Sequence, residues 1–180
     1  MSTLREKILE HNRVFVANGE YTRYASSKSP AKKLAVVACM DTRLVELLPA
    51  AMGLKNGDIK LIKNAGGSVS SAFDSAMRSL LVAVYLLGVE EIAVVGHYDC
   101  GAQGMKSEVV IEKMLARGVK REEIDKLDFL ESWLTGFEDD AQSVQASMSM
   151  VLNHPLMPKD VKVYGFLIDP NTGRLDEVAA

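Results

Sequence analysis

Short apolar runs that end abruptly in polar residues are the feature that most constrains the fold of this chain. Residues 34–39 and 92–96 are continuously apolar, and each run is followed at once by charged or polar side chains. Such runs are typical of strands that are buried on both faces of a parallel sheet. Segments of helical periodicity separate the runs, so the sequence predicts an α/β fold with right-handed crossover connections.

The expected elements follow from periodicity and from capping and turn residues. Helices are predicted at residues 3–18, from 44 to about 53, and at 72–87, 107–117, 121–134 and 138–152. Strands are predicted at residues 34–39, 59–63, 92–96 and 161–168. The fold class is therefore a mainly parallel β-sheet flanked by helices, with a C-terminal edge strand. We expect one domain over residues 1–180, in which residues 1–33 form a helix and linker that pack on a partner subunit.

Chemically useful residues follow three of the predicted strands. Because the carboxyl ends of parallel strands meet at one edge of a sheet, we expect these residues to converge there. Two thiolates and an imidazole are good zinc ligands, and three such ligands leave a fourth position for water or for a nearby carboxylate. The residues concerned form the segments Cys39-Met40-Asp41-Thr42-Arg43, Asn64-Ala65-Gly66-Gly67 and His97-Tyr98-Asp99-Cys100.

Asp41 and Arg43 are spaced so that their side chains can pair. A guanidinium fork fits a carboxylate in bidentate geometry, which would keep Asp41 ionised and fixed in orientation. Asp41 could then accept a hydrogen bond from a zinc-bound hydroxide, or it could bind zinc itself as the fourth ligand. Tyr98 and Asp99 are candidates for carrying the released proton away.

Simpler interpretations of the same residues remain open at the level of sequence. Cys39 and Cys100 could form a disulfide, hold a structural zinc with a fourth protein ligand, or be inert core thiols. The segment 64–67 could be only a tight turn, or its backbone could line the zinc pocket. Lys63 could be a solvated charge, or it could attract an anion to the pocket.

Charge and hydropathy exclude several classes of function. The net charge is −3 and the isoelectric point is about 5.7, so no nucleic-acid partner is expected. No run reaches the roughly 18 apolar residues of a membrane span. The first residues are amphipathic and charged, unlike a signal peptide, so a cytoplasmic location and no membrane partner are expected.

Three segments together carry a family resemblance. Cys39-x-Asp41-x-Arg43, Asn64-Ala65-Gly66-Gly67 and His97-x-x-Cys100-Gly101 resemble, in order and spacing, the β-class carbonic anhydrases, in particular their short microbial subgroup. The resemblance runs from about residue 34 to residue 102 and returns in the strand around residues 163–166. Tyr98 departs from it, because a small Ser or Thr is usual there. Lys63 also departs, because Arg is common at that position.

The resemblance implies a function and a set of roles. Cys39, His97 and Cys100 would bind Zn²⁺, Asp41 and Arg43 would form the catalytic dyad, and Asp41 would alternate with water as the fourth ligand. Asn64, Ala65, Gly66 and Gly67 would line the substrate pocket. The reaction implied is zinc-hydroxide attack on carbon dioxide to give bicarbonate, in a homodimer or homotetramer.

Two alternative functions fit the same residues. The first is hydrolysis of carbonyl sulfide or carbon disulfide at the same metal site, because the metal and the dyad would serve those substrates equally. The second is a zinc-binding or redox-sensing protein without catalysis. The Asp41–Arg43 pair argues against the second, because storage or sensing needs no oriented hydroxide.

Overall fold

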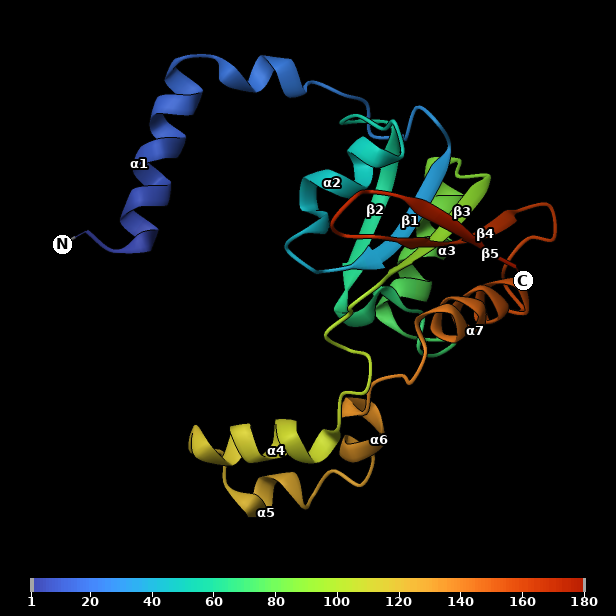
Figure 1. Cartoon of the computed structure of the whole chain (residues 1–180). Helices are drawn as coiled ribbons and strands as arrows, with labels where there is room; N and C mark the ends of the chain where they lie inside the picture. The colour runs from blue at the N-terminus through green and yellow to red at the C-terminus, as the bar shows by residue number, and fades with distance from the viewer. Residues whose placement is uncertain (1, 180) are drawn as a thin grey trace.

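A five-stranded sheet forms the centre of the molecule in the computed structural model, which describes residues 2–179. The strand order is β2-β1-β3-β4-β5, and every pair is parallel except β4 with β5 (Figure 1). The predicted α/β class and mainly parallel sheet are confirmed. The strands are β1 (Leu34–Cys39), β2 (Ile59–Asn64), β3 (Glu91–His97), β4 (Lys162–Ile168) and β5 (Leu175–Val178).

The apolar runs become the two strands at the middle of the buried sheet. Side chains alternate between the faces of a strand, so odd and even positions of β1 enter different cores. Val36 and Ala38 pack beneath α2 (Leu44–Ala51), whereas Ala35 and Val37 pack beneath α3 (Ser75–Leu87). The helix α7 (Asp140–Leu152) covers the α3 face beside β3 and β4. Helices on both faces explain why residues 34–39 and 92–96 include no charged or strongly polar side chains.

The C-terminal edge strand is confirmed, but it is β5, a strand that the sequence analysis did not place. The predicted strand at 161–168 corresponds to β4, which lies inside the sheet between β3 and β5. The turn after β4 is held by Asp169, whose backbone oxygen accepts a hydrogen bond from the backbone N–H of Gly173. That turn reverses the chain and makes β5 antiparallel.

The helix α3 begins at Ser75, three residues later than predicted. Asp74 is its N-cap: one carboxylate oxygen accepts a hydrogen bond from the Met77 N–H at 2.7 Å, and the other accepts one from the Ser70 N–H at 2.6 Å. An N-cap of this kind satisfies donors that the first helical turn leaves free. Gly88, with φ of 71°, ends the helix as predicted.

Two helical segments extend away from the sheet, one at the upper left and the other at the lower left of Figure 1. The N-terminal arm consists of α1 (Leu4–Ala17) and the short helix η1 (Glu20–Tyr24). A capping box formed by Thr3 and Glu6 begins α1. The helical lobe consists of α4 (Ser107–Ala116), α5 (Arg121–Ile124) and α6 (Leu130–Leu134).

The prediction of one helix over residues 121–134 is wrong, because residues 125–129 are not helical and separate α5 from α6. Ile124 and Leu130 both pack against Ile111 in the core of the lobe. Six residues of a straight helix would turn these two side chains about 120° away from each other. The break lets both side chains enter the same small core.

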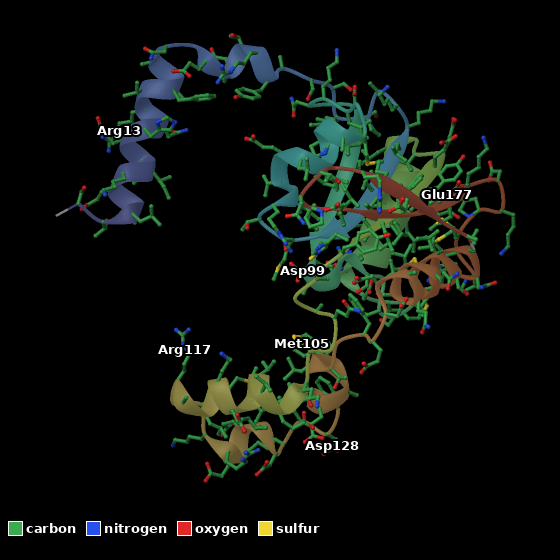
Figure 2. The ribbon with its side chains drawn as sticks, in the orientation of Figure 1. Arg13, Asp99, Met105, Arg117, Asp128 and Glu177 are labelled. Carbon is green, nitrogen blue, oxygen red and sulfur yellow. The ribbon has the colours of Figure 1, made fainter. Side chains whose placement is uncertain are left out.

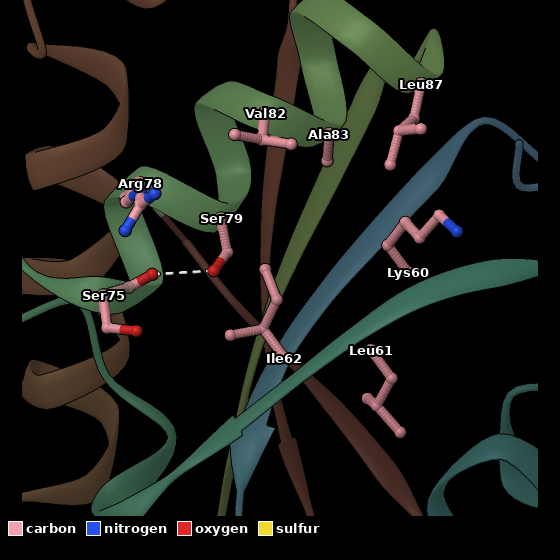
Figure 3. Close-up of a pocket in the computed structure, with 9 residues that line it drawn as sticks. All are labelled: Lys60, Leu61, Ile62, Ser75, Arg78, Ser79, Val82, Ala83 and Leu87. Carbon is pink, nitrogen blue, oxygen red and sulfur yellow. Dashed lines mark hydrogen bonds between the residues drawn. The ribbon is translucent and has the colours of Figure 1, made fainter. Parts of the chain in front are cut away.

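An open groove lies between the edge strand β2 and α3 (Figure 3). Leu61, Ile62 and Val82 line it, together with Lys60 and Arg78. It contains none of the residues predicted for the site. No helix within residues 2–179 is long and apolar enough to cross a membrane.

Candidate metal centre

The sheet brings the predicted metal ligands together. Cys39 is the last residue of β1 and His97 is the last residue of the adjacent β3, while Cys100 lies three residues further on. The ligand atoms of these three buried residues all lie within 4.8 Å of one another. The convergence that the sequence predicted at the carboxyl ends of the strands is therefore present in the structure.

The spacing of the two sulfur atoms fits a tetrahedral metal. The Sγ atoms of Cys39 and Cys100 are 3.9 Å apart, and both cysteines are free. Two zinc–sulfur bonds of about 2.3 Å at a tetrahedral angle would place the sulfur atoms about 3.8 Å apart. A disulfide would need about 2.05 Å. The disulfide alternative is therefore excluded, and the geometry suits a shared ion.

His97 presents its free ring nitrogen to the same space. Nδ1 lies 2.9 Å from the backbone oxygen of Tyr98, and a carbonyl can only accept, so Nδ1 carries the hydrogen. In the neutral ring Nε2 is then the unprotonated nitrogen; it is buried and has no hydrogen-bond partner among the described residues. A buried acceptor without a partner is costly, and a metal ion would satisfy it.

The two thiols differ in acidity. Burial raises the pKa of Cys39, but the neighbouring His97 and backbone groups of Asp41 and Gly66 outweigh burial and lower it from 9.0 to about 7. Burial raises the pKa of Cys100 to about 11. Cys39 is thus the thiol that ionises first, and a bound cation would draw the proton from Cys100 as well.

Asp41 and Arg43 form the predicted ion pair. Arg43 donates from Nε to Asp41 Oδ1 at 3.0 Å and from Nη2 to Oδ2 at 2.8 Å, so the pair is bidentate. Arg43 lowers the pKa of Asp41 to about 2. Asp41 Oδ2 lies 3.9 Å from Nε2 of His97, so the fixed carboxylate borders the ligand cluster.

Asp99 is a member of this network that the sequence analysis did not assign. Its Oδ2 accepts a hydrogen bond from Arg43 Nη1 at 2.9 Å, and its backbone oxygen accepts one from Arg43 Nη2 at 2.9 Å. Asp99 has a φ of 56°, which is uncommon for a residue other than glycine. Its place between His97 and Cys100 was the available signal, but the sequence analysis considered it only as a proton carrier.

The segment 64–67 approaches the cluster through its backbone. A Cβ on Gly67 would lie 2.5 Å from the backbone nitrogen of Cys39, so only glycine fits there. The Asn64 side chain does not reach the cluster: its amide donates to the Ser68 oxygen at 2.7 Å, and its oxygen accepts from the Ser68 N–H at 3.0 Å. Asn64 thus stabilises the turn in which Gly67 packs against β1.

Two further charged groups near the site are buried. Lys63 Nζ and Asp140 Oδ1 have no hydrogen-bond partner among the described residues. Burial lowers the pKa of Lys63 and raises that of Asp140. The interpretation of Lys63 as a solvated charge is therefore wrong. Asp140 was missed because, in sequence, it resembles any acidic residue in the first turn of a helix.

The fold and the cluster define a class of protein: an α/β enzyme with a two-cysteine, one-histidine metal centre and an adjoining aspartate–arginine pair. The profile of the carbonic anhydrase family matches residues 34–175. YvdA of Bacillus subtilis (strain 168), provisionally named a carbonic anhydrase, is 51% identical over 175 residues, which cover 95% of this chain and 89% of YvdA.

Two further comparisons bear on the class. The crystal structure of β-carbonic anhydrase isoform I from Trichomonas vaginalis superposes with a TM-score of 0.90 at 35% identity and covers 99% of this chain and 98% of that one. A carbon disulfide hydrolase from Acidianus sp. (strain A1-3) is 32% identical over 161 residues, covering 80% of this chain and 76% of that protein. The chain belongs to the β-carbonic anhydrase family, and carbonic anhydrases are lyases.

Proposed function

We propose that this protein catalyses the reversible hydration of carbon dioxide to bicarbonate, with Zn²⁺ held by Cys39, His97 and Cys100. The observation that carries the proposal is the convergence of three buried ligand atoms beside a carboxylate fixed by arginine. Bound zinc would supply a nucleophile near neutral pH by lowering the pKa of water. Family membership supports this reaction.

The chain's own residues would orient the attack. Arg43 keeps Asp41 ionised down to a pH of about 2, so Asp41 is a hydrogen-bond acceptor at all working pH values. An acceptor fixed in this way can hold the proton of the attacking water and turn an oxygen lone pair toward the substrate. The backbone of the segment 64–67 would line the pocket in which carbon dioxide is held.

Stopped-flow hydration of carbon dioxide by zinc-loaded protein tests the proposal, with Asp41→Ala as the diagnostic variant. We expect fast turnover in the parent protein, a loss of at least about a hundredfold in the variant, and equal zinc content in both. Asp125→Ala is a matched control, because Asp125 pairs only loosely with Arg121 on the distant α5, at 3.9 Å. Absence of turnover in the zinc-loaded, folded parent protein would refute the proposal.

The second candidate is hydrolysis of carbon disulfide or carbonyl sulfide. The 32% identity to a carbon disulfide hydrolase over 80% of this chain favours it as the alternative. Release of hydrogen sulfide from either substrate, measured with the same protein, would distinguish it from carbonic anhydrase activity. Zinc binding with no turnover on any of the three substrates would point to the non-catalytic alternative.

We also propose that the protein works as a homodimer or homotetramer. None of the residues of α1 is buried, and Leu4 and Ile8 are 74% and 58% exposed on a helix that projects from the sheet. Apolar side chains on an arm of this kind are stabilised by packing on a second subunit. Sedimentation equilibrium is expected to give a multiple of 19.7 kDa, and a monomer at micromolar concentration would refute the assembly.

A further inference from the structure

Arg43 is held between two carboxylates that come from different loops. Asp41 lies on the loop after β1, the strand that ends in Cys39. Asp99 lies on the loop after β3, the strand that ends in His97, and Cys100 follows Asp99 on that loop. The guanidinium donates to Asp41 from Nε and Nη2, and to Asp99 from Nη1 and Nη2. Arg43 is therefore a direct polar link between the two loops that border the metal ligands.

The contact with Asp99 restrains a movement that the contact with Asp41 leaves open. A bidentate pair determines the plane of the guanidinium relative to Asp41 but not the position of the pair as a whole. The two bonds to Asp99 anchor the far edge of the guanidinium to the second loop. They hold Arg43, and through it Asp41, at a set distance from the ligand cluster.

The backbone conformation of Asp99 favours this contact with Arg43. Its φ of 56° turns its carbonyl oxygen and its carboxylate toward the same guanidinium. Figure 2 shows Asp99 at the side of the sheet that lies to the left in this view. Its side chain is 85% exposed, which limits the strength of the ion pair. An ion pair this weak can shift the equilibrium between two positions of the Arg43–Asp41 pair, although it contributes little to the stability of the fold.

We propose that Asp99 is a positioning residue that holds Arg43, and so keeps the Asp41 carboxylate on the guanidinium and away from the fourth metal position. This inference rests on the proposed metal centre. Without Asp99, the Arg43–Asp41 pair is free to move toward the cluster, and Asp41 can compete with water or an anion for the fourth position.

Azide binding to the cobalt-loaded protein, followed by visible absorption, tests this inference without measuring turnover. An exposed ion pair contributes at most about 1 kcal/mol, which corresponds to about fivefold in an equilibrium constant. We therefore expect Asp99→Asn to raise the Kd for azide two- to fivefold. Asn tolerates a positive φ, and Asp99→Gly removes the side chain without backbone strain, so both variants keep the loop conformation.

The decisive comparison uses a background without the competing carboxylate. In Asp41→Asn protein, adding Asp99→Asn is expected to leave the Kd for azide unchanged, because no aspartate remains to be released. Asp125→Asn is the control for loss of an exposed acid elsewhere. An unchanged Kd in Asp99→Asn, or the same rise in both backgrounds, would overturn the inference. Because azide affinity is independent of the substrate, a failure of the proposed carbon dioxide activity would not affect this result.

Discussion

Asp41 and Arg43 are joined by two parallel side-chain hydrogen bonds of 3.0 and 2.8 Å, and the Arg43 backbone N–H adds a third, to Asp41 Oδ1, at 2.8 Å. A carboxylate bound in this way has a fixed orientation, unlike one attracted only by a nearby charge. The pair follows Cys39 directly on the loop after β1. The orientation of Asp41 is therefore fixed relative to the end of β1, where the metal ligand Cys39 lies.

Arg43→Lys should impair catalysis although it keeps the charge. A lysine ammonium is a point charge and cannot form the fork that fixes both oxygens of Asp41, nor can it bind Asp99 at the same time. We expect kcat/KM for carbon dioxide hydration to fall by about 10- to 100-fold with full zinc content. Stopped-flow assays and metal analysis measure both. Parent-like kcat/KM in the lysine variant would show that charge alone is sufficient.

The depressed pKa of Asp41 predicts a loss of stability in acid. Its folded-state value of about 2 lies below the ordinary 3.8, so its ionisation stabilises the fold above pH 4, and this contribution is lost as the pH falls from about 4 to about 2. The shift corresponds to at most about 2 kcal/mol. Urea unfolding of the metal-free protein at several pH values should show Asp41→Asn less stable at pH 6 and equal to the parent near pH 2. A pH-independent difference would contradict this assignment.

The buried strands, and the edge of the sheet at which the metal ligands meet, could be predicted from sequence because both depend on local pattern. β1 is observed at the predicted residues, and β3 extends only one residue beyond the prediction at each end. Once parallel strands are expected, the convergence of Cys39 and His97 follows from their place at strand ends. Capping signals located the start of α1 and the end of α3 for the same local reason.

The missed features depend on contacts between distant residues. The break between α5 and α6 serves a shared core with Ile111 on α4, which periodicity within residues 121–134 cannot show. β5 has only four residues, too few for a clear alternation, and its strand state depends on pairing with β4. The contact of Asp99 with Arg43 joins residues 56 positions apart. Sequence reasoning identified the charges but could not choose their partners.

Metal binding should release protons, and more of them at lower pH. At pH 8, Cys39, with a pKa of about 7, is mostly a thiolate, whereas Cys100, with a pKa of about 11, is protonated. Zinc ligation requires both cysteines as thiolates and Nε2 of His97 without a proton, and the neighbouring Cys39 raises the pKa of His97. We therefore expect at least about one proton released per zinc at pH 8 and more than about two at pH 6. Calorimetric titrations in two buffers with different ionisation enthalpies give this count. His11→Gln, on the exposed arm, is the control and should leave it unchanged. Zinc uptake without proton release would contradict the ligand set.

Gly67 should be far less tolerant of substitution than Gly53, although the two have nearly the same φ. Their φ values are 64° and 65°, so Ala costs about 1–2 kcal/mol of conformational energy at either position. A Cβ at Gly53 meets nothing within 4 Å, whereas at Gly67 it would lie 2.5 Å from the Cys39 nitrogen and 2.8 Å from the Ala38 carbonyl carbon. Backbone atoms cannot move aside as side chains do, so Gly67→Ala must displace the end of β1 and, with it, Cys39.

We expect Gly67→Ala to lower the free energy of unfolding by about 2 kcal/mol more than Gly53→Ala, since overpacking typically costs 1–3 kcal/mol. We also expect it to weaken zinc binding, which Gly53→Ala should leave intact. Urea unfolding and competition with a zinc chelator measure the two effects. Equal losses of stability in the two variants would show that the turn only needs its backbone angle, and that the segment 64–67 does not support the metal centre.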